Sequence, residues 1–446
     1  MDETLPGRRD ILRAGGLGAL SLFWADWLRA EAKSPAPRKA KARSVILIFN
    51  CGGPSHIDLW DPKPEASIDV RGLFRAIPTN VAGIRLSELL PRLAKRADKL
   101  AIVRSLHHLH SSHNAAMYWS IVGRPYPVDS TLINPSRQDL PSFGTLAGWL
   151  AQRDGYGGAL PPYVITPGPH CDSLQYITPG QFGACLGPKH DPFVLNGDPN
   201  AEDFKVPDLG PADGMPPDRL RLRNALLGRL DSSPIETVDS REIETFRSKA
   251  MSLVTSPEVQ AAFDLSKEPD AVRDRYGRHS WGQSHLLARR LVEAGVRFVT
   301  TVNGRSIIWD THKDNFASMR DRLVPPMEQA FAALLDDLSE RGLLESTLVL
   351  WMGDFGRTPM INKDAGRDHW PQCFSAVLAG GGIRGGQVVG SSDSIGAHPE
   401  SRPVTPADIH ATVFSALGYD PRAISYRTSD GRPMTLTDGE PIRELL

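Results

Sequence analysis

Cysteine is scarce in this chain, with four residues among 446, so a fold held together by disulfides is excluded. The four positions match no zinc-knuckle spacing, which also excludes a small cysteine-based metal module. Two states stay open for the thiols: a Cys171–Cys185 bridge in an oxidising compartment, or four buried thiols.

An excess of charge of either sign is also missing. The chain has 51 basic and 52 acidic residues, and no dense basic run lies beyond its first 45 residues. This balance excludes a dedicated nucleic-acid surface. No apolar run is long enough to span a bilayer, so the mature chain is not expected to be an integral membrane protein. The 40% of hydrophobic residues are enough for a large core.

The N-terminal segment 1–32 has the pattern of a twin-arginine signal peptide. Arg8 and Arg9 precede a weakly apolar stretch, and Ala30-Glu31-Ala32 offers a small-x-small cleavage site. A membrane anchor is the alternative, but the stretch is short and interrupted by glycines and an aspartate. We therefore predict export by the twin-arginine translocase to the periplasm or the extracellular space. A basic linker is expected over 33–43.

Apolar runs and helical repeats alternate along the rest of the chain. We predict strands at Val45–Phe49, Leu100–Val103, Tyr163–Thr166, Arg297–Val302, Thr347–Met352 and Phe374–Leu378. Helical patterns lie between them, and two of these end at Gly123 and Gly295. This alternation predicts a largely parallel sheet covered on both faces. Residues of about 218–265 are interpreted as a helical insertion, and 167–217 as long surface loops.

Carboxylates and imidazoles gather beside the predicted strand ends, where α/β enzymes keep their chemistry. The predicted metal ligands are Asp58, Asp310, His312, Asp354 and His369. Aspartate and histidine are ligand types that divalent ions prefer. The alternative for each aspartate is a helix cap or turn former, and for each histidine a structural loop residue.

A helix N-terminus after SLHHLHSSHN offers a place for an anion or a nucleophile. The candidates there are Ser112 and His113, and the alternative is an ordinary N-cap. Two loop arginines, Arg357 and Arg367, are predicted to bind an anionic group through their guanidinium groups. The alternative is that both are ordinary solvated loop residues.

Seven fragments of the chain resemble the DUF1501 family, whose members are secreted proteins of unassigned activity in the alkaline phosphatase/sulfatase superfamily. The fragments are GGPSHIDLWDPKP, SHNAAMYWSIVGRP, LLARRLVEAGVRFV, WDTHKDNF, GDFGRTP, GRDHWPQCFSAVLAGGGIRGG and VTPADIHATVFSALG. The resemblance covers nearly all of the mature chain, expected over 44–446. It implies an alkaline-phosphatase-like α/β/α sandwich with a largely parallel central sheet and a helical insertion.

The resemblance also implies roles for residues. One metal position would be formed by Asp310, His312 and His369, and a second, depleted one by Asp58 and Asp354. The chain departs from the superfamily pattern at Phe355, where many members have a second histidine, and at the helix opening, where the best register places His113. Formylglycine chemistry of the ordinary sulfatase kind is disfavoured because no C-x-P-S-R motif is present.

We therefore expect an exported metal-dependent hydrolase that acts on a phosphate, sulfate or related anionic ester. The metal is expected to be zinc, with manganese or calcium as alternatives and one or two ions per chain. Ser112 would be the nucleophile in a covalent mechanism, and metal-bound water in a direct one. The competing expectation is a non-catalytic exported protein that binds an envelope glycan on the same scaffold.

Overall fold

The computed structural model describes residues 40–446 apart from 174, 203, 205, 207–221, 223–225, 227–255 and 305. The predicted signal peptide, most of the basic linker and most of the helical insertion lie outside the described residues. Among the residues that are described, no helix combines the length and the apolar character that crossing a membrane requires.

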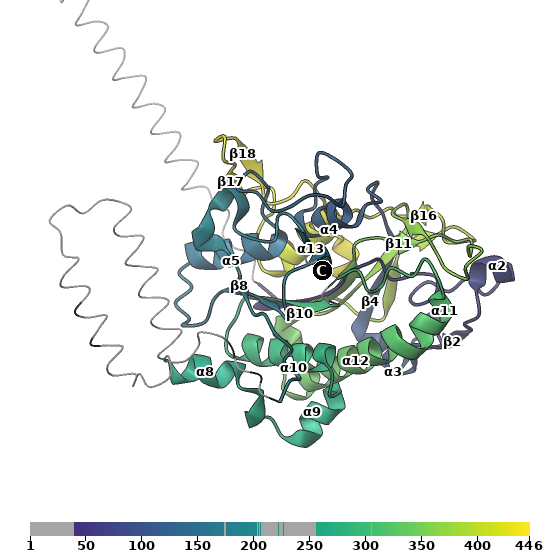
Figure 1. Ribbon diagram of the computed structural model, residues 1–446, viewed down its shortest axis with the longest axis horizontal. Helices are drawn as coiled ribbons and strands as arrows, with labels where there is room; N and C mark the ends of the chain where they lie inside the picture. Colours follow the sequence, from purple (N-terminus) through teal and green to yellow (C-terminus); the bar gives the residue numbers. More distant parts are fainter. Residues whose placement is uncertain are drawn as a thin grey trace, which may run out of the picture.

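An eight-stranded sheet forms the centre of the molecule (Figure 1). In spatial order its strands are β14 (Gln387–Val389), β4 (Leu100–Leu106), β13 (Phe374–Gly380), β10 (Thr347–Gly353), β1 (Ser44–Asn50), β9 (Phe298–Asn303), β5 (Tyr163–Thr166) and β8 (Phe193–Val194). β13 runs antiparallel to both of its neighbours, and all other pairs are parallel. The carboxyl ends of the seven codirectional strands therefore meet at one edge.

Helices cover both faces of the sheet (Figure 1). On one face lie α3 (Pro91–Ala94), α8 (Pro257–Phe263), α9 (Asp270–Tyr276), α10 (Ser280–Glu293) and α12 (Val324–Glu340). On the other lie α4 (His113–Val122), α5 (Phe143–Arg153) and α13 (Pro406–Ala416). Strand alternation divides the core accordingly: Ile46 of β1 packs with the first group, and Leu47 with the second.

Short elements complete the described part of the chain. The helices are α2 (Ile68–Arg71) and α11 (Asn315–Ser318), and the hairpins are β2 (Ala76–Pro78) with β3 (Arg85–Ser87), β6 (Cys171–Ser173) with β7 (Tyr176–Ile177), β11 (Gly356–Arg357) with β12 (His369–Trp370), β15 (Ser391–Ser392) with β16 (Pro399–Ser401), and β17 (Ser425–Arg427) with β18 (Pro433–Thr435). The β11–β12 hairpin matters most here, because it joins the loop after Asp354 to His369.

The predicted α/β/α sandwich with a largely parallel sheet is confirmed, and every predicted strand is present with its ends moved by a few residues. The stretch 167–217 differs from its prediction as surface loops. Its described part contains β6, β7 and β8 and buries His170 and Gln181, because it packs against α4 and α5. The four cysteines are thiols in the structure, so the Cys171–Cys185 bridge is absent.

Candidate metal centre

The candidate site lies at the edge of the sheet where the parallel strands end. Asp354 directly follows β10, and Asp310 lies in the loop that leaves β9. His113 is the first residue of α4, which the chain enters after β4. Chain segments far apart in sequence therefore converge at the carboxyl ends of neighbouring strands, the usual place for a site in a parallel sheet.

Three imidazoles turn their Nε2 atoms toward the carboxylate of Asp310. The Nε2 atoms of His312 and His369 each lie 3.1 Å from Asp310 Oδ1. The Nε2 atom of His113 lies 3.5 Å from Oδ2 of the same carboxylate. His113 is buried, whereas His312 and His369 keep some exposure, so the cluster can be reached from solvent on one side.

Each of these rings has its other nitrogen fixed by an acceptor. His113 Nδ1 lies 2.6 Å from Asp354 Oδ2, and His312 Nδ1 lies 2.6 Å from Asp368 Oδ1. His369 Nδ1 lies 2.7 Å from the carbonyl oxygen of Ser111. Carboxylates and carbonyls only accept hydrogen bonds, so in each ring Nδ1 carries the hydrogen. In its neutral form such a ring presents the Nε2 lone pair to Asp310, and in its protonated form it donates from Nε2 as well.

This arrangement is unfavourable without a cation or protons. The Nε2 atoms of His312 and His369 are 3.0 Å apart, and both face the same carboxylate oxygen. Two neutral lone pairs and an anionic oxygen at this spacing repel one another. Burial lowers the pKa of His113, but interactions with Asp310 and Asp354 outweigh it and raise the pKa to about 9. A metal would replace that proton.

The atoms of the cluster fit a small divalent ion. Four ligands placed about 2.0–2.1 Å from a tetrahedral zinc lie about 3.3 Å from one another. The separations from Asp310 Oδ1 to His312 and His369 are 3.1 Å, the two Nε2 atoms are 3.0 Å apart, and His113 Nε2 lies 3.5 Å from Oδ2, the other oxygen of the carboxylate. One ligand atom each from His113, Asp310 and His369 lies within 4.8 Å of the other two, and His312 adds a fourth at hydrogen-bonding distance from two of them.

Buried groups hold the carboxylates of the cluster in place. The Arg357 guanidinium lies 2.7 Å from Asp310 Oδ1. Burial opposes the ionisation of Asp310, yet His113, His369 and Arg357 lower its pKa well below the ordinary range. The other carboxylate, Asp354, accepts the backbone N–H of Gly52 at 3.0 Å. A side chain at Gly52, which has φ +105°, would collide with the backbone at Asp310.

The structure does not bring the predicted ligand Asp58 into this cluster. Its carboxylate accepts two bonds from Arg367, at 2.8 and 3.1 Å, and one from Asn315 at 2.9 Å. Asp58 and Arg367 are both completely buried. Asp354 lies beside the cluster, where one of its oxygens accepts from Gly52 and the other contacts His113 Nδ1.

The two predicted anion-binding arginines are also engaged elsewhere. Arg367 uses all five of its N–H donors on Asp58 and three backbone carbonyls. Arg357 is buried and donates to four backbone carbonyls as well as contacting Asp310. The predicted nucleophile Ser112 is the N-cap residue of α4, and its backbone N–H donates to Asp129 at 2.8 Å.

Some functional contacts were missed by the sequence reasoning. Asp368 is not among the predicted site residues, but its carboxylate holds His312. Asn315 had no assigned role, although it shares the WDTHKDNF fragment with two predicted ligands. Asp172 is likewise not among the predicted site residues. Its pKa is raised, mainly by burial, and the charges of His113 and Asp310 also act on it, in opposite directions. This carboxyl therefore lies within electrostatic reach of the cluster. No local motif marks Asp172.

Comparison with protein families gives one match that covers nearly the whole chain. The model of a family described as "Protein of unknown function (DUF1501)" matches residues 42–446. No protein in a set of curated proteins matches.

Solved structures give only distant likenesses. The sulfatase PsFucS1 from Pseudoalteromonas sp. shares 14% identity at a TM-score of 0.36, with 88% of this chain and 70% of that chain covered. A protein of the alkaline phosphatase superfamily from Vibrio parahaemolyticus shares 10% identity at a TM-score of 0.40, with 86% of this chain and 69% of that chain covered. The lipoteichoic acid synthase LtaP from Listeria monocytogenes shares 10% identity at a TM-score of 0.35, with 90% of this chain and 88% of that chain covered. At these values the likenesses assign no residue role to this chain.

Proposed function

The chain belongs to the DUF1501 family, and we propose that it is an exported metal-dependent hydrolase of the alkaline phosphatase/sulfatase superfamily, acting on a phosphate, sulfate or related ester. The observation that supports this most directly is the set of three imidazoles whose Nε2 atoms converge on Asp310 while their Nδ1 atoms are bonded elsewhere.

The residues that would hold the ion are His113, Asp310, His312 and His369. Their mixture of imidazole and carboxylate suits zinc, with manganese or calcium as alternatives. When bound, the metal supplies a Lewis acid that polarises the ester or lowers the pKa of a coordinated water.

The chain's own residues around the ion have supporting tasks in this proposal. Asp354 and Asp368 keep two of the rings in the tautomer that leaves Nε2 free. Arg357 compensates part of the negative charge of Asp310. Ser112, next to His113 at the start of α4, is the candidate nucleophile of a covalent mechanism. The twin-arginine pattern at Arg8 and Arg9 supports export by the translocase to the periplasm or beyond.

A second candidate is a non-catalytic exported binding protein on the same scaffold. The ring of Phe355 packs 4.9 Å from His113 and 4.6 Å from His369, at the position where many superfamily members have a further histidine. Both predicted anion-gripping arginines are satisfied within the protein. These two features favour binding without turnover.

Elemental analysis of the exported protein tests the proposal. The parent, Asp310→Asn and His369→Gln are compared with Asp191→Asn, a control carboxylate that pairs with Arg137 outside the cluster. We expect about one zinc, manganese or calcium ion per chain in the parent and the control. Both cluster variants should lose most of it while keeping the parent's circular dichroism.

Hydrolysis of p-nitrophenyl phosphate and p-nitrophenyl sulfate is then measured on the same samples. Turnover that disappears with the metal supports the hydrolase, whereas bound metal without turnover of either ester favours the second candidate. A parent that takes up no ion from excess zinc, or an Asp310→Asn variant that keeps its full metal content, would overturn the metal centre itself.

A further inference from the structure

A pocket of about 270 Å³ opens at the same edge of the sheet as the cluster. Its lining residues are Pro167, Gly197, Asp198, Ser280, Trp281 and Gly304. Pro167 directly follows β5, and Gly304 directly follows β9, the strand that leads to Asp310. Drug-sized ligands occupy roughly 300–1,000 Å³, so this pocket has room for one small ring.

An indole ring connects the pocket to the cluster. Trp281, at the start of α10, is partly exposed and lies nearly parallel to Trp309, with ring centroids 6.0 Å apart and 21° between the planes. Trp309 is completely buried and directly precedes Asp310 in the chain. The buried ring therefore fixes the orientation of Trp281, whose other face remains available as a flat apolar surface.

Polar groups surround this indole. Asp198 is exposed, and one of its oxygens accepts the backbone N–H of Asn200 at 2.9 Å, which leaves the carboxylate with accepting capacity. Ser280 adds a hydroxyl from the first turn of α10.

Two further buried polar atoms lie at the strand ends behind the pocket. Thr166 Oγ1 and Asn303 Oδ1 are buried without a hydrogen-bond partner, and each residue immediately precedes a residue of the lining. Val164 and Val299 pack on the α10 face of the sheet, so strand alternation directs Thr166 and Asn303 to that face as well.

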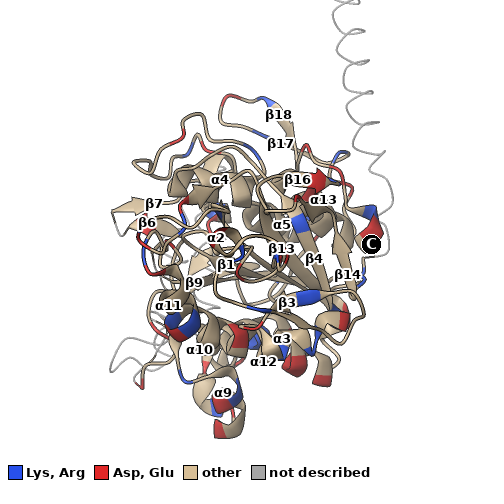
Figure 2. Ribbon diagram, turned by 90° about the vertical axis from the view of Figure 1, so that its right-hand side faces the viewer, with Lys and Arg blue, Asp and Glu red and all other residues tan. Residues whose placement is uncertain are grey.

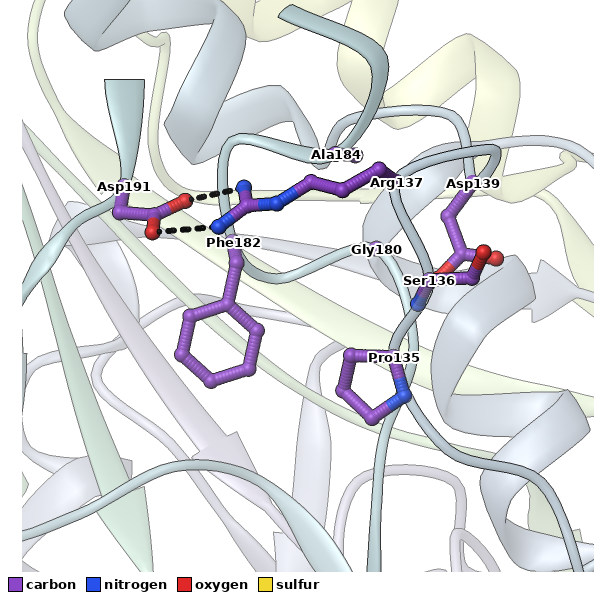
Figure 3. Close-up of a pocket in the computed structure, with 8 residues that line it drawn as sticks. All are labelled: Pro135, Ser136, Arg137, Asp139, Gly180, Phe182, Ala184 and Asp191. Carbon is purple, nitrogen blue, oxygen red and sulfur yellow. Dashed lines mark hydrogen bonds and ion pairs between the residues drawn. The ribbon is translucent and has the colours of Figure 1, made fainter. Parts of the chain in front are cut away.

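The charge of the pocket decides the kind of ligand. Among the described residues that line it, Asp198 is the one charged residue, and a carboxylate disfavours an anionic group beside it. A second pocket, of about 330 Å³, is lined by Arg137, Asp139 and Asp191 among others (Figure 3). Arg137 and Asp191 bind each other at 2.8 and 3.0 Å, and Asp139 accepts from the backbone N–H of Ser136 at 2.7 Å. That pocket shares no residue with the cluster and has no tryptophan in its lining.

We infer that the Trp281 pocket binds a neutral sugar ring, with the indole against its C–H face and Asp198 accepting from its hydroxyl groups. The inference rests on the proposed function in one respect: it makes a saccharide the carrier of the ester that the neighbouring metal cluster would attack. A sugar ring combines one apolar face with a rim of hydroxyls, which matches an indole bordered by acceptors and donors.

Saturation-transfer difference NMR on the full exported protein tests the inference. The probes are glucose, galactose, mannose and N-acetylglucosamine, together with cellobiose, maltose and lactose. The variants are Trp281→Ala and the milder Asp198→Asn. Trp149→Ala, which removes a partly exposed tryptophan of α5 on the opposite face of the sheet, serves as the control.

We expect at least one of these sugars to bind the parent and the control with the same dissociation constant. The dissociation constant should rise about tenfold or more in Trp281→Ala, because an aromatic contact is lost. It should also rise in Asp198→Asn. Binding that is equal in the parent and both pocket variants overturns the inference, as does a parent that binds none of the sugars. Metal content is measured in parallel, so a failed pocket and a failed metal centre give different results.

Discussion

Removal of the buried arginine Arg367 should destabilise the protein strongly without emptying the metal centre. Both Arg367 and Asp58 are completely inaccessible to solvent, and Asp58 otherwise receives one neutral hydrogen bond, from Asn315 at 2.9 Å. The Arg367→Met variant keeps an apolar side chain of similar length but leaves the carboxylate without its cation. Sequence reasoning expected Asp58 to bind metal, so this variant separates the two roles of the residue.

The magnitude follows from the contacts. Breaking a buried ion pair by removing one partner costs about 3–5 kcal/mol, because the remaining charge stays desolvated. The three backbone carbonyls that Arg367 also satisfies lose a donor, which places the value at the upper end of this range. Asp58→Asn should cost a similar amount. In the double variant both charges are gone, so we expect a coupling of about 3 kcal/mol between the two sites.

The assay is urea unfolding of the four proteins in the presence of a chelator, so that metal binding does not contribute to the midpoint. The exposed pair Arg137–Asp191 provides the matched control. Arg137→Met and Asp191→Asn should each shift the free energy of unfolding by at most about 1 kcal/mol.

Two results would refute this reasoning. Additive losses in the double variant would mean that Asp58 and Arg367 do not compensate each other. An Asp58→Asn variant with parental stability and a lost metal ion would restore Asp58 as a ligand.

Two other predictions concern carboxylates with arginine or histidine partners. Asp368→Asn should lower the metal affinity about tenfold or more, because the carboxylate that makes the His312 ring more basic is lost. Competition with a chelating dye measures this affinity, and an unchanged value would contradict the prediction. Burial raises the pKa of Asp337, but Arg341 and Arg289 outweigh it and lower the pKa below the ordinary value. Because the folded-state pKa is the lower one, this stabilisation is complete above about pH 4 and is lost as the pH falls further. Urea midpoints from about pH 6 to about pH 3 should fall more steeply for the parent than for Asp337→Asn.

The sheet could be predicted from the sequence because its strands are buried on both faces. β1 and β10 are continuous apolar runs whose every residue is buried, and such runs have no solvent-facing alternative. The antiparallel direction of β13 could not be predicted. Its run at Phe374–Gly380 is also buried and largely apolar, and its direction depends on the long connection from β10 rather than on the strand itself.

Of the predicted metal ligands, Asp310, His312 and His369 lie together. The partners of Asp58 and Asp368 could not be read from the sequence. Asp368 meets His312 at a sequence distance of 56 residues. Asp58 meets Arg367 at a sequence distance of 309 residues. Such pairings are fixed by tertiary packing and leave no local pattern.

The rings of His113 and Phe355 lie together at the cluster. His113 opens α4, and Phe355 lies in the loop after β10. Their ring centroids are 4.9 Å apart, so an imidazole enters the cluster from α4 while an apolar ring packs against it from the loop after β10. The carboxylates needed for a second ion, Asp58 and Asp354, are held by other partners, and the site should therefore bind one ion rather than two.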